Sequence, residues 1–165
     1  MTYQELEAKI GKQNQADWHQ HKNGGGWVHA TGRVDETAFV GEQTIVWGIV
    51  SENARVYENA RVYENARVYG NARVYGNAQV YGNAQVYGDA QVYGNAWSKP
   101  VLFLLDSKGF GCTNCKHGWL KIGCEEHTFA DWKKLGKAIA KKYNLTEAEI
   151  VEYEAVVELF CKIGL

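Results

Sequence analysis

Four potential metal ligands lie near one another in the last third of the chain. Cys112 and Cys115 form one pair, and Cys124 and His127 form a second pair with the same spacing. Tetrahedral zinc takes four thiolate or imidazole ligands from two such corners, and a structural zinc ion stabilises a small domain. We therefore predict structural zinc at these four residues, with His117 as a competing ligand.

Two other interpretations of the same residues stay open. Free cysteines are often buried as small hydrophobic side chains, which would place Cys112 and Cys124 in a core. Alternatively, Cys124 and His127 lie just before an expected helix and form a nucleophilic pair. The sequence shows no third group that would orient such a pair.

Arginine and tyrosine recur every six residues in the middle of the chain, where the units read SENARV, YENARV, YENARV, YGNARV, YGNAQV, YGNAQV, YGDAQV and YGNAW. Aromatic rings beside guanidinium groups can bind a nucleotide, with the base on a ring and the phosphate on an arginine. The predicted ligand-binding residues are Arg55, Tyr57, Arg61, Tyr63, Arg67, Tyr69, Arg73 and Tyr75. In the alternative interpretation the stacked tyrosines stabilise the fold, and one row of them forms a contact between subunits.

The period of six defines the element that carries these side chains. Seven valines keep one phase, and an alanine lies two residues before each of them. The valines are Val56, Val62, Val68, Val74, Val80, Val86 and Val92. Residues two apart in an extended segment face the same side, so alanine and valine face inward while arginine or glutamine and tyrosine face outward. Asparagine, preceded by glycine or glutamate, occupies the corner.

Three such units closing a triangle give a coil of 18 residues, and stacked coils form a parallel β-helix. The pattern resembles the hexapeptide repeat of left-handed β-helices, and this resemblance implies the left hand. A weaker array at Val28, Val34, Val40 and Val46 adds to the first, which gives about four coils. Val46 and Val56 are ten residues apart, so we expect a loop or a bulged corner between the arrays.

The fold class is therefore mainly β, with three parts. Residues 1–26 form an N-terminal capping helix and a glycine turn, residues 27–97 the β-helix, and residues 98–165 a small α+β cap with a hairpin and two helices. The residues expected to be buried on the two helices are Phe129, Trp132, Leu135, Ile139 and Tyr143, then Ile150, Tyr153, Val157 and Phe160.

Beyond the repeat, the chain resembles phage and prophage hexapeptide-repeat proteins. The resemblance is carried by HKNGGGWV at His21–Val28, the NARVYGNA units, the exit at Ala96 and Trp97, and IGCEEHTFADW at Ile122–Trp132. Such proteins are often labelled putative transferases or polymer-forming proteins. The resemblance implies a phage origin and a role in the contest between virus and host, but it supplies no reaction.

Catalysis is the main alternative to binding. In hexapeptide-repeat acyltransferases a histidine near the subunit groove acts as general base, and in a carbonic-anhydrase-like branch histidines hold zinc. The candidates here are His19, His21 and His29, around the glycine turn, whereas the long repeat contains no histidine. We therefore expect a non-catalytic binding or scaffold protein, with acyl-CoA-dependent acyltransfer as the alternative and a zinc-dependent hydratase or hydrolase as a third class.

The composition limits which classes of binding partner we expect for this protein. The net charge is −1, which does not favour general nucleic-acid binding, and no apolar run is long enough for a membrane span. The polar first residues do not read as a signal peptide, and four cysteines without secretion features indicate reduced thiols or metal ligands. We expect a protein of the bacterial host cytoplasm that forms a homo-oligomer, a trimer above all, and captures a small anionic ligand or a host protein.

Overall fold

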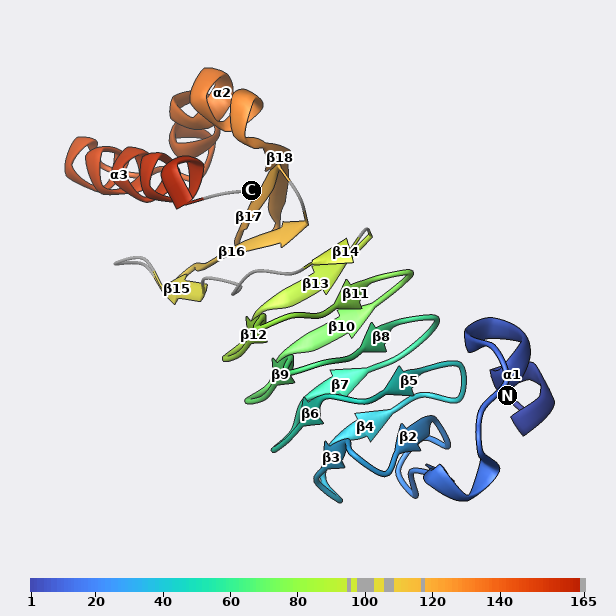
Figure 1. Ribbon diagram of the computed structural model, residues 1–165. Coiled ribbons are helices and arrows are strands. Elements are labelled where there is room, and N and C mark those ends of the chain that lie inside the picture. Colours follow the sequence, from blue (N-terminus) through green and yellow to red (C-terminus); the bar gives the residue numbers. More distant parts are fainter. Residues whose placement is uncertain (95, 98–102, 106–108, 117, 164–165) are drawn as a thin grey trace. The chain divides into compact units, whose positions relative to one another are not determined.

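The computed structural model describes residues 1–94, 96–97, 103–105, 109–116 and 118–163 (Figure 1). The chain divides into two compact units, Met1–Pro100 and Val101–Leu165. The first unit is a β-solenoid of about four turns with an N-terminal helix, and the second combines helices with antiparallel strands. The predicted fold class is confirmed.

The solenoid strands stack in three parallel sheets. The first sheet contains β2 (Trp27–His29), β5 (Ile45–Val46), β8 (Arg61–Val62), β11 (Gln79–Val80) and β14 (Ala96–Trp97). The second sheet contains β4 (Phe39–Val40), β7 (Arg55–Val56), β10 (Arg73–Tyr75) and β13 (Gln91–Tyr93). The third sheet contains β3 (Arg33–Val34), β6 (Ile49–Val50), β9 (Arg67–Val68) and β12 (Gln85–Val86). Each strand pairs with the strand one coil away, and valine pairs with valine, as in Val56↔Val74 and Val74↔Val92. Equivalent side chains of the repeat therefore form columns that run along the solenoid.

The interior of the solenoid consists of the repeat's valines and alanines. Each valine from Val56 to Val92 and each alanine from Ala54 to Ala90 in the repeat phase has no exposed surface. Burial of apolar side chains is the main favourable term in folding, and here a short repeat supplies it in every coil. The predicted inward phase is confirmed.

The left-handed backbone of each corner falls on the residue before asparagine. Glu52, Glu58 and Glu64 have φ of 59°, and glycine takes the same position from Gly70 onward with φ above 60°. A left-handed glutamate costs free energy that glycine does not. At two corners the glutamate gains a compensating contact, because the carboxylates of Glu58 and Glu64 accept hydrogen bonds from the N–H groups of residues 76 and 82, at 2.8 and 2.7 Å.

The irregular step between Val46 and Val56 is a shortened corner and not an inserted loop. Val50 belongs to strand β6 and is fully buried, only four residues after Val46. The two usual corner residues are missing. Gly48 takes the inward alanine position, where an added Cβ would lie 2.6 Å from the carbonyl oxygen of Ala66. The chain can turn here only because glycine leaves that space empty.

Helix α1 (Tyr3–Ile10) begins with a capping box of Thr2 and Glu5. It packs on the outer face of the first sheet, where Leu6 is buried with Trp27 and Ile45. The first coil is instead protected at its edge by β1 (Trp18–Gln20), which follows the 3₁₀ turn η1 (Gln15–Asp17) and pairs antiparallel with β2.

The glycine turn before β2 protects the neighbouring edge. The N–H of Val40 in β4 donates to the carbonyl of Asn23 at 3.0 Å, and the N–H of Gly26 donates to the carbonyl of Val40 at 2.9 Å. Unpaired strand edges promote aggregation. The edges of the first coil are therefore protected by β1 and the glycine turn.

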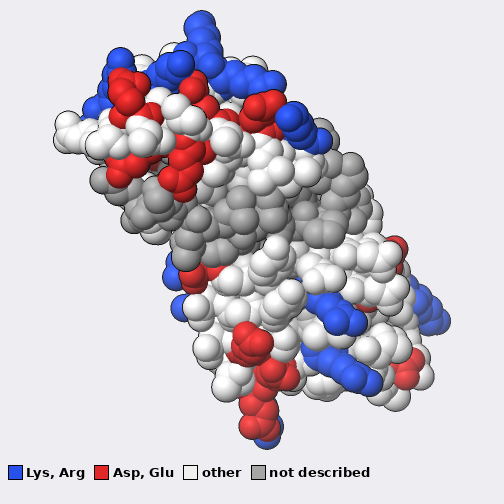
Figure 2. Space-filling model, turned by 90° about the vertical axis from the view of Figure 1, so that its left-hand side faces the viewer, with Lys and Arg blue, Asp and Glu red and all other residues white. Residues whose placement is uncertain are grey.

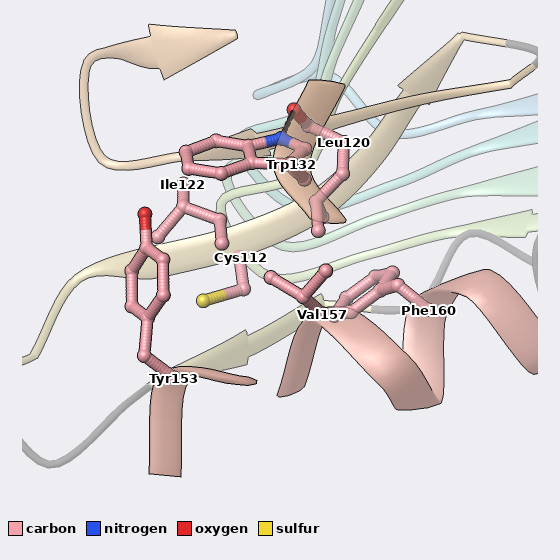
Figure 3. Close-up of a cluster of buried hydrophobic side chains, with 7 residues drawn as sticks. All are labelled: Cys112, Leu120, Ile122, Trp132, Tyr153, Val157 and Phe160. Atoms are coloured by element: carbon pink, nitrogen blue, oxygen red, sulfur yellow. Dashed lines mark hydrogen bonds between the residues drawn. The ribbon is translucent and has the colours of Figure 1, made fainter. Parts of the chain in front are cut away.

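The C-terminal unit has an antiparallel sheet of β15 (Phe103–Leu105), β16 (Gly111–Lys116), β17 (Trp119–Ile122) and β18 (Glu125–Thr128), followed by α2 (Phe129–Lys142) and α3 (Glu147–Ile163). Its core contains Cys112, Leu120, Ile122, Trp132, Tyr153, Val157 and Phe160 (Figure 3). The indole N–H of Trp132 donates to the carbonyl of Leu120 at 2.6 Å.

The expected burial was right for α3 and partly wrong for α2. The four predicted residues of α3 are all buried. On α2, however, Leu135 and Tyr143 are about two-fifths exposed, because the helix packs through the row Trp132, Gly136 and Ala140. Because Gly136 and Ala140 are small, this face of α2 can pack closely on the rest of the unit, and the larger apolar side chains of Leu135 and Tyr143 lie on the more exposed side.

Across the described ranges, no helix has the length and the apolar character that crossing a membrane requires.

Candidate ligand-binding groove

A groove of about 410 Å³ opens on the outer face of the first sheet. Its lining combines aromatic, cationic and hydrogen-bonding side chains. They are Thr31, Trp47, Arg61, Tyr63, Glu64 and Gln79. Arg61 and Tyr63 belong to the predicted ligand set, and the other four do not.

The aromatic wall is a column built by the position that follows each inward valine. Trp47 follows Val46 and Tyr63 follows Val62, which are paired across β5 and β8. The rings of Trp47 and Tyr63 meet edge to face at 6.4 Å, and Tyr81 stacks on Tyr63 at 5.3 Å. Trp18 also contacts Trp47 edge to face at 4.8 Å, so a further ring supports the indole of Trp47. Such contacts pre-order the rings before a ligand arrives.

Arg61 supplies the positive charge from the column of residues that precede the inward valines. Its neighbours in this column are Ile45 below and Gln79 above. Within the described residues, no carboxylate lies within ion-pair distance of its guanidinium. The half-buried Arg61 is therefore available to bind an anion, and its planar guanidinium suits a carboxylate or phosphate.

The remaining polar groups are already oriented. The hydroxyl of Tyr63 donates to Oε1 of Gln79 at 3.0 Å. Burial raises the pKa of Tyr63, and the neighbouring Tyr81 and Glu64 raise it further, so this hydroxyl stays protonated. The carboxylate of Glu64 is occupied by the N–H of Gly82. The groove thus presents ring surfaces and a cation, while the carboxylate of Glu64 is bound by the backbone of the next coil.

The other predicted ligand residues lie on the remaining faces of the solenoid. Arg55, Tyr57, Arg73 and Tyr75 belong to the second sheet, and Arg67 and Tyr69 to the third. The predicted tyrosine stacks are present, with centroid distances of 5.0 to 5.6 Å. The eight residues therefore form three separate surfaces.

The other two faces arrange their arginines and rings differently in the part of the chain that the structure describes. On the second sheet, the guanidinium of Arg55 lies 5.0 Å from the ring centroid of Phe39. The third sheet has a hollow of about 460 Å³ lined by Ile49, Asn65, Arg67, Asn83 and Gln85, without an aromatic ring. Figure 2 looks onto the solenoid from the side of the third sheet, where charged side chains form only small separate groups.

The four predicted zinc ligands have separate surroundings. Cys112 lies in the hydrophobic core and Cys115 is also buried, both in the continuous strand β16 and not at a turn. Cys124 is exposed, and its Sγ lies 3.2 Å from the hydroxyl of Tyr143. Within the described part of the chain, no three histidine, cysteine or acidic side chains converge as metal ligands. The four residues as placed do not fit a tetrahedral site, and zinc stays a prediction; His117 lies outside the described residues.

The same region contains a polar network that the sequence did not indicate. The carboxylate of Glu125 accepts hydrogen bonds from Lys142 at 2.9 Å and Tyr143 at 2.8 Å, and lies 3.2 Å from Nε2 of His127. The Lys142 contact, followed by those of Tyr143 and His127, lowers the pKa of Glu125 to about 2. The contacts with Cys124 and Glu125 raise the pKa of Tyr143. His127 faces Glu125 and the Trp132 ring, so the described contacts do not form the hypothesised pair with Cys124.

Two of the three N-terminal histidines have structural contacts. His21 is buried, with Nε2 3.0 Å from the carbonyl oxygen of Ala38. Nδ1 of His29 lies 2.8 Å from the hydroxyl of Thr31, and its ring packs against Trp18. His19 is exposed on β1. Among the contacts of the described residues, none favours any of these histidines as a general base.

Sequence reasoning missed the groove because it treated Trp47 as part of a break in the repeat. Trp47 in fact occupies the tyrosine position after an inward valine, which the valine phase alone could have shown. Thr31 gave no signal, because it comes to the groove from the irregular first coil.

Comparison with known proteins supports the fold. A family model described as "YdcK Beta solenoid repeat" matches residues 66–82, 78–94 and 84–98. The matches begin at positions that differ by multiples of six, in step with the period of the repeat. The chain is a solenoid repeat protein. Comparisons with curated proteins and with solved structures gave no match.

Proposed function

We propose that the protein is a non-catalytic binding protein that captures a small planar anion, such as a nucleotide, in the groove of Trp47, Arg61 and Tyr63. The observation that carries the proposal is that Arg61 lines the same groove as two aromatic rings. A base packs on an aromatic ring, and a guanidinium binds phosphate through paired N–H groups. The groove volume of about 410 Å³ lies in the range of small-molecule sites.

Titration calorimetry with a panel of mononucleotides and dinucleotides tests the proposal. We expect heat from at least one member and a loss of about tenfold to a hundredfold in affinity for Arg61→Gln, since a charge-assisted hydrogen bond is worth roughly 1.5–3 kcal/mol. The repeat itself places glutamine at this position in Gln79, Gln85 and Gln91, so the fold should accept the change.

Arg67→Gln is the matched control, because it makes the same change on the third sheet. It should leave the affinity unaltered. Equal losses in both variants would contradict binding in the groove and point to a general charge effect. No heat from any nucleotide would remove the small-ligand proposal and leave only capture of a host protein.

The proposal also includes a phage origin, a homotrimer and a place in the bacterial cytoplasm. Light scattering on the purified protein tests the trimer, which requires three times the mass of one chain. The alternative function, acyl-CoA-dependent acyltransfer, is tested by thiol release from acetyl-CoA with a range of amines and alcohols.

A further inference from the structure

Helix α3 has apolar side chains on two opposite faces. Ile150, Tyr153, Val157 and Phe160 point into the core of the C-terminal unit. On the other side lie Val151, Ala155, Leu159 and Ile163, each four residues after the last. Of these, Val151 is 65% exposed, Leu159 42% and Ile163 43%, and Ala155 is also exposed. We call these four residues the outer stripe.

The spacing makes the outer stripe continuous. With about 3.6 residues per turn, residues four apart form one row along a helix. An exposed row of this kind usually marks a contact with another chain, because a helix with one buried face needs no second apolar face. Acidic residues occupy much of the remaining surface of α3, whereas α2 carries five lysines. Figure 2 shows acidic and basic side chains crowded together on this unit.

We propose that the outer stripe is a contact between two copies of this chain, with their α3 helices packed antiparallel about a two-fold axis near Val157. In this register Val151 faces the partner's Ile163, and Ala155 faces the partner's Leu159. The large and small side chains alternate across the contact, as ridge-into-groove packing requires.

Charge complementarity supports the second copy as the occupant. The same register brings Glu152 opposite the partner's Lys162, and the two-fold axis repeats this pair on the other side. Lys162 already pairs with Glu158 at 2.8 Å within its own chain, which holds the ammonium beside the stripe. The pairing therefore sets opposite charges at both ends of the stripe and disfavours a parallel arrangement, which would align Glu152 with its own copy.

The contact is small, so its strength is limited. Stable interfaces bury about 1,200–2,000 Å², and one helical row supplies less. We expect an association that depends on concentration and is independent of any contact made by the solenoid. This proposal does not rest on the proposed ligand groove.

Sedimentation equilibrium of the full chain over a wide concentration range tests the proposal. Leu159→Glu should lower the mean mass at high concentration below that of the wild type, to the mass that any contact made by the solenoid alone provides. Leu135→Glu is the matched control, since Leu135 is equally exposed, at 40%, but lies on α2 away from the stripe. It should keep the wild-type mass.

A charge swap tests the register. Glu152→Lys and Lys162→Glu should each weaken the association at low salt, and the double variant should restore it. Circular dichroism must show that every variant keeps its helices; a variant that loses them is replaced by Ala155→Glu. An unchanged mass for Leu159→Glu and Ala155→Glu, or no recovery in the double variant, would overturn the proposal.

Discussion

The carboxylate of Glu125 joins two elements of the C-terminal unit. It lies on β18 and is bound by Lys142 and Tyr143 at the end of α2. A carboxylate with a lowered pKa stabilises the folded state above its unfolded pKa, and the contribution is lost as the pH falls towards the folded pKa. For Glu125 these limits are the ordinary value of 4.5 and about 2.

We therefore predict that Glu125→Gln lowers the melting temperature of this unit at pH 7, and that the difference from wild type disappears as the pH falls from 4.5 to about 2. Thermal melts followed by tryptophan fluorescence across this range measure the difference. Glu36→Gln, which removes an exposed carboxylate of the solenoid, is the control. A constant difference in melting temperature down to pH 2 would show that the negative charge of Glu125 does not stabilise the folded unit and that packing of its side chain does.

The cysteines differ sharply in access. Cys124 is exposed, whereas Cys112 and Cys115 have no exposed surface. An alkylating reagent should modify Cys124 in the folded protein within the time that leaves the two buried thiols intact, and Cys124→Ser should leave only the slower modification of the half-buried Cys161. Peptide mass spectrometry identifies the sites. Zinc held by the four predicted ligands would protect Cys124 until a chelator is added, so the same experiment decides the zinc prediction.

At the level of the element, the solenoid corners show how one position serves two residue types. Glu58 has a left-handed backbone but binds the N–H of Gly76. Glu58→Ala loses the hydrogen bond and keeps the strain, whereas Glu58→Gly loses the bond and relieves the strain. We predict that the alanine variant is less stable than the glycine variant by about 1 kcal/mol, measured by urea unfolding. Equal stabilities would mean that the corner relaxes.

The shortened corner at Gly48 makes a stronger demand. An added Cβ would lie 2.6 Å from a backbone oxygen of Ala66 and 2.9 Å from Cγ1 of Val62. Gly48→Ala should cost about 1–3 kcal/mol, as overpacking does. Gly136→Ala on α2 is the contrast, because its added Cβ meets only ordinary contacts at 3.9 Å and a helical alanine gains about 0.5–1 kcal/mol. If Gly48→Ala unfolded at the wild-type urea concentration, the close packing described here would be incorrect.

At the scale of the whole molecule, most of the fold could be predicted from the sequence, because every six-residue unit repeats the same pattern of inward and outward side chains. Valine and alanine in one phase decide the inward face, the coil length and the tyrosine stacks together. The groove was not predicted, because the step between Val46 and Val56 was interpreted as a loop or a bulged corner, whereas a corner two residues short places Trp47 next to Tyr63. The zinc prediction assumed corners at two ligand pairs, Cys112 with Cys115 and Cys124 with His127, and β16 continues as a strand through the first pair.

The two compact units each enclose their own buried apolar side chains, which predicts separate unfolding. The C-terminal unit has one small core around Trp132, whereas the solenoid repeats its core in every coil. Small single cores are marginally stable, so we expect calorimetry to show two transitions, the lower from the C-terminal unit. Trp132→Phe removes the hydrogen bond to Leu120 and leaves a cavity, which should cost about 2–4 kcal/mol.

This loss should lower the first transition and leave the second in place. Gly48→Ala, in the solenoid, should do the reverse, and the pair of variants therefore assigns each transition to its unit. A single transition that both variants shift equally would show that the two units unfold together, which would require an interface strong enough to couple two separate cores.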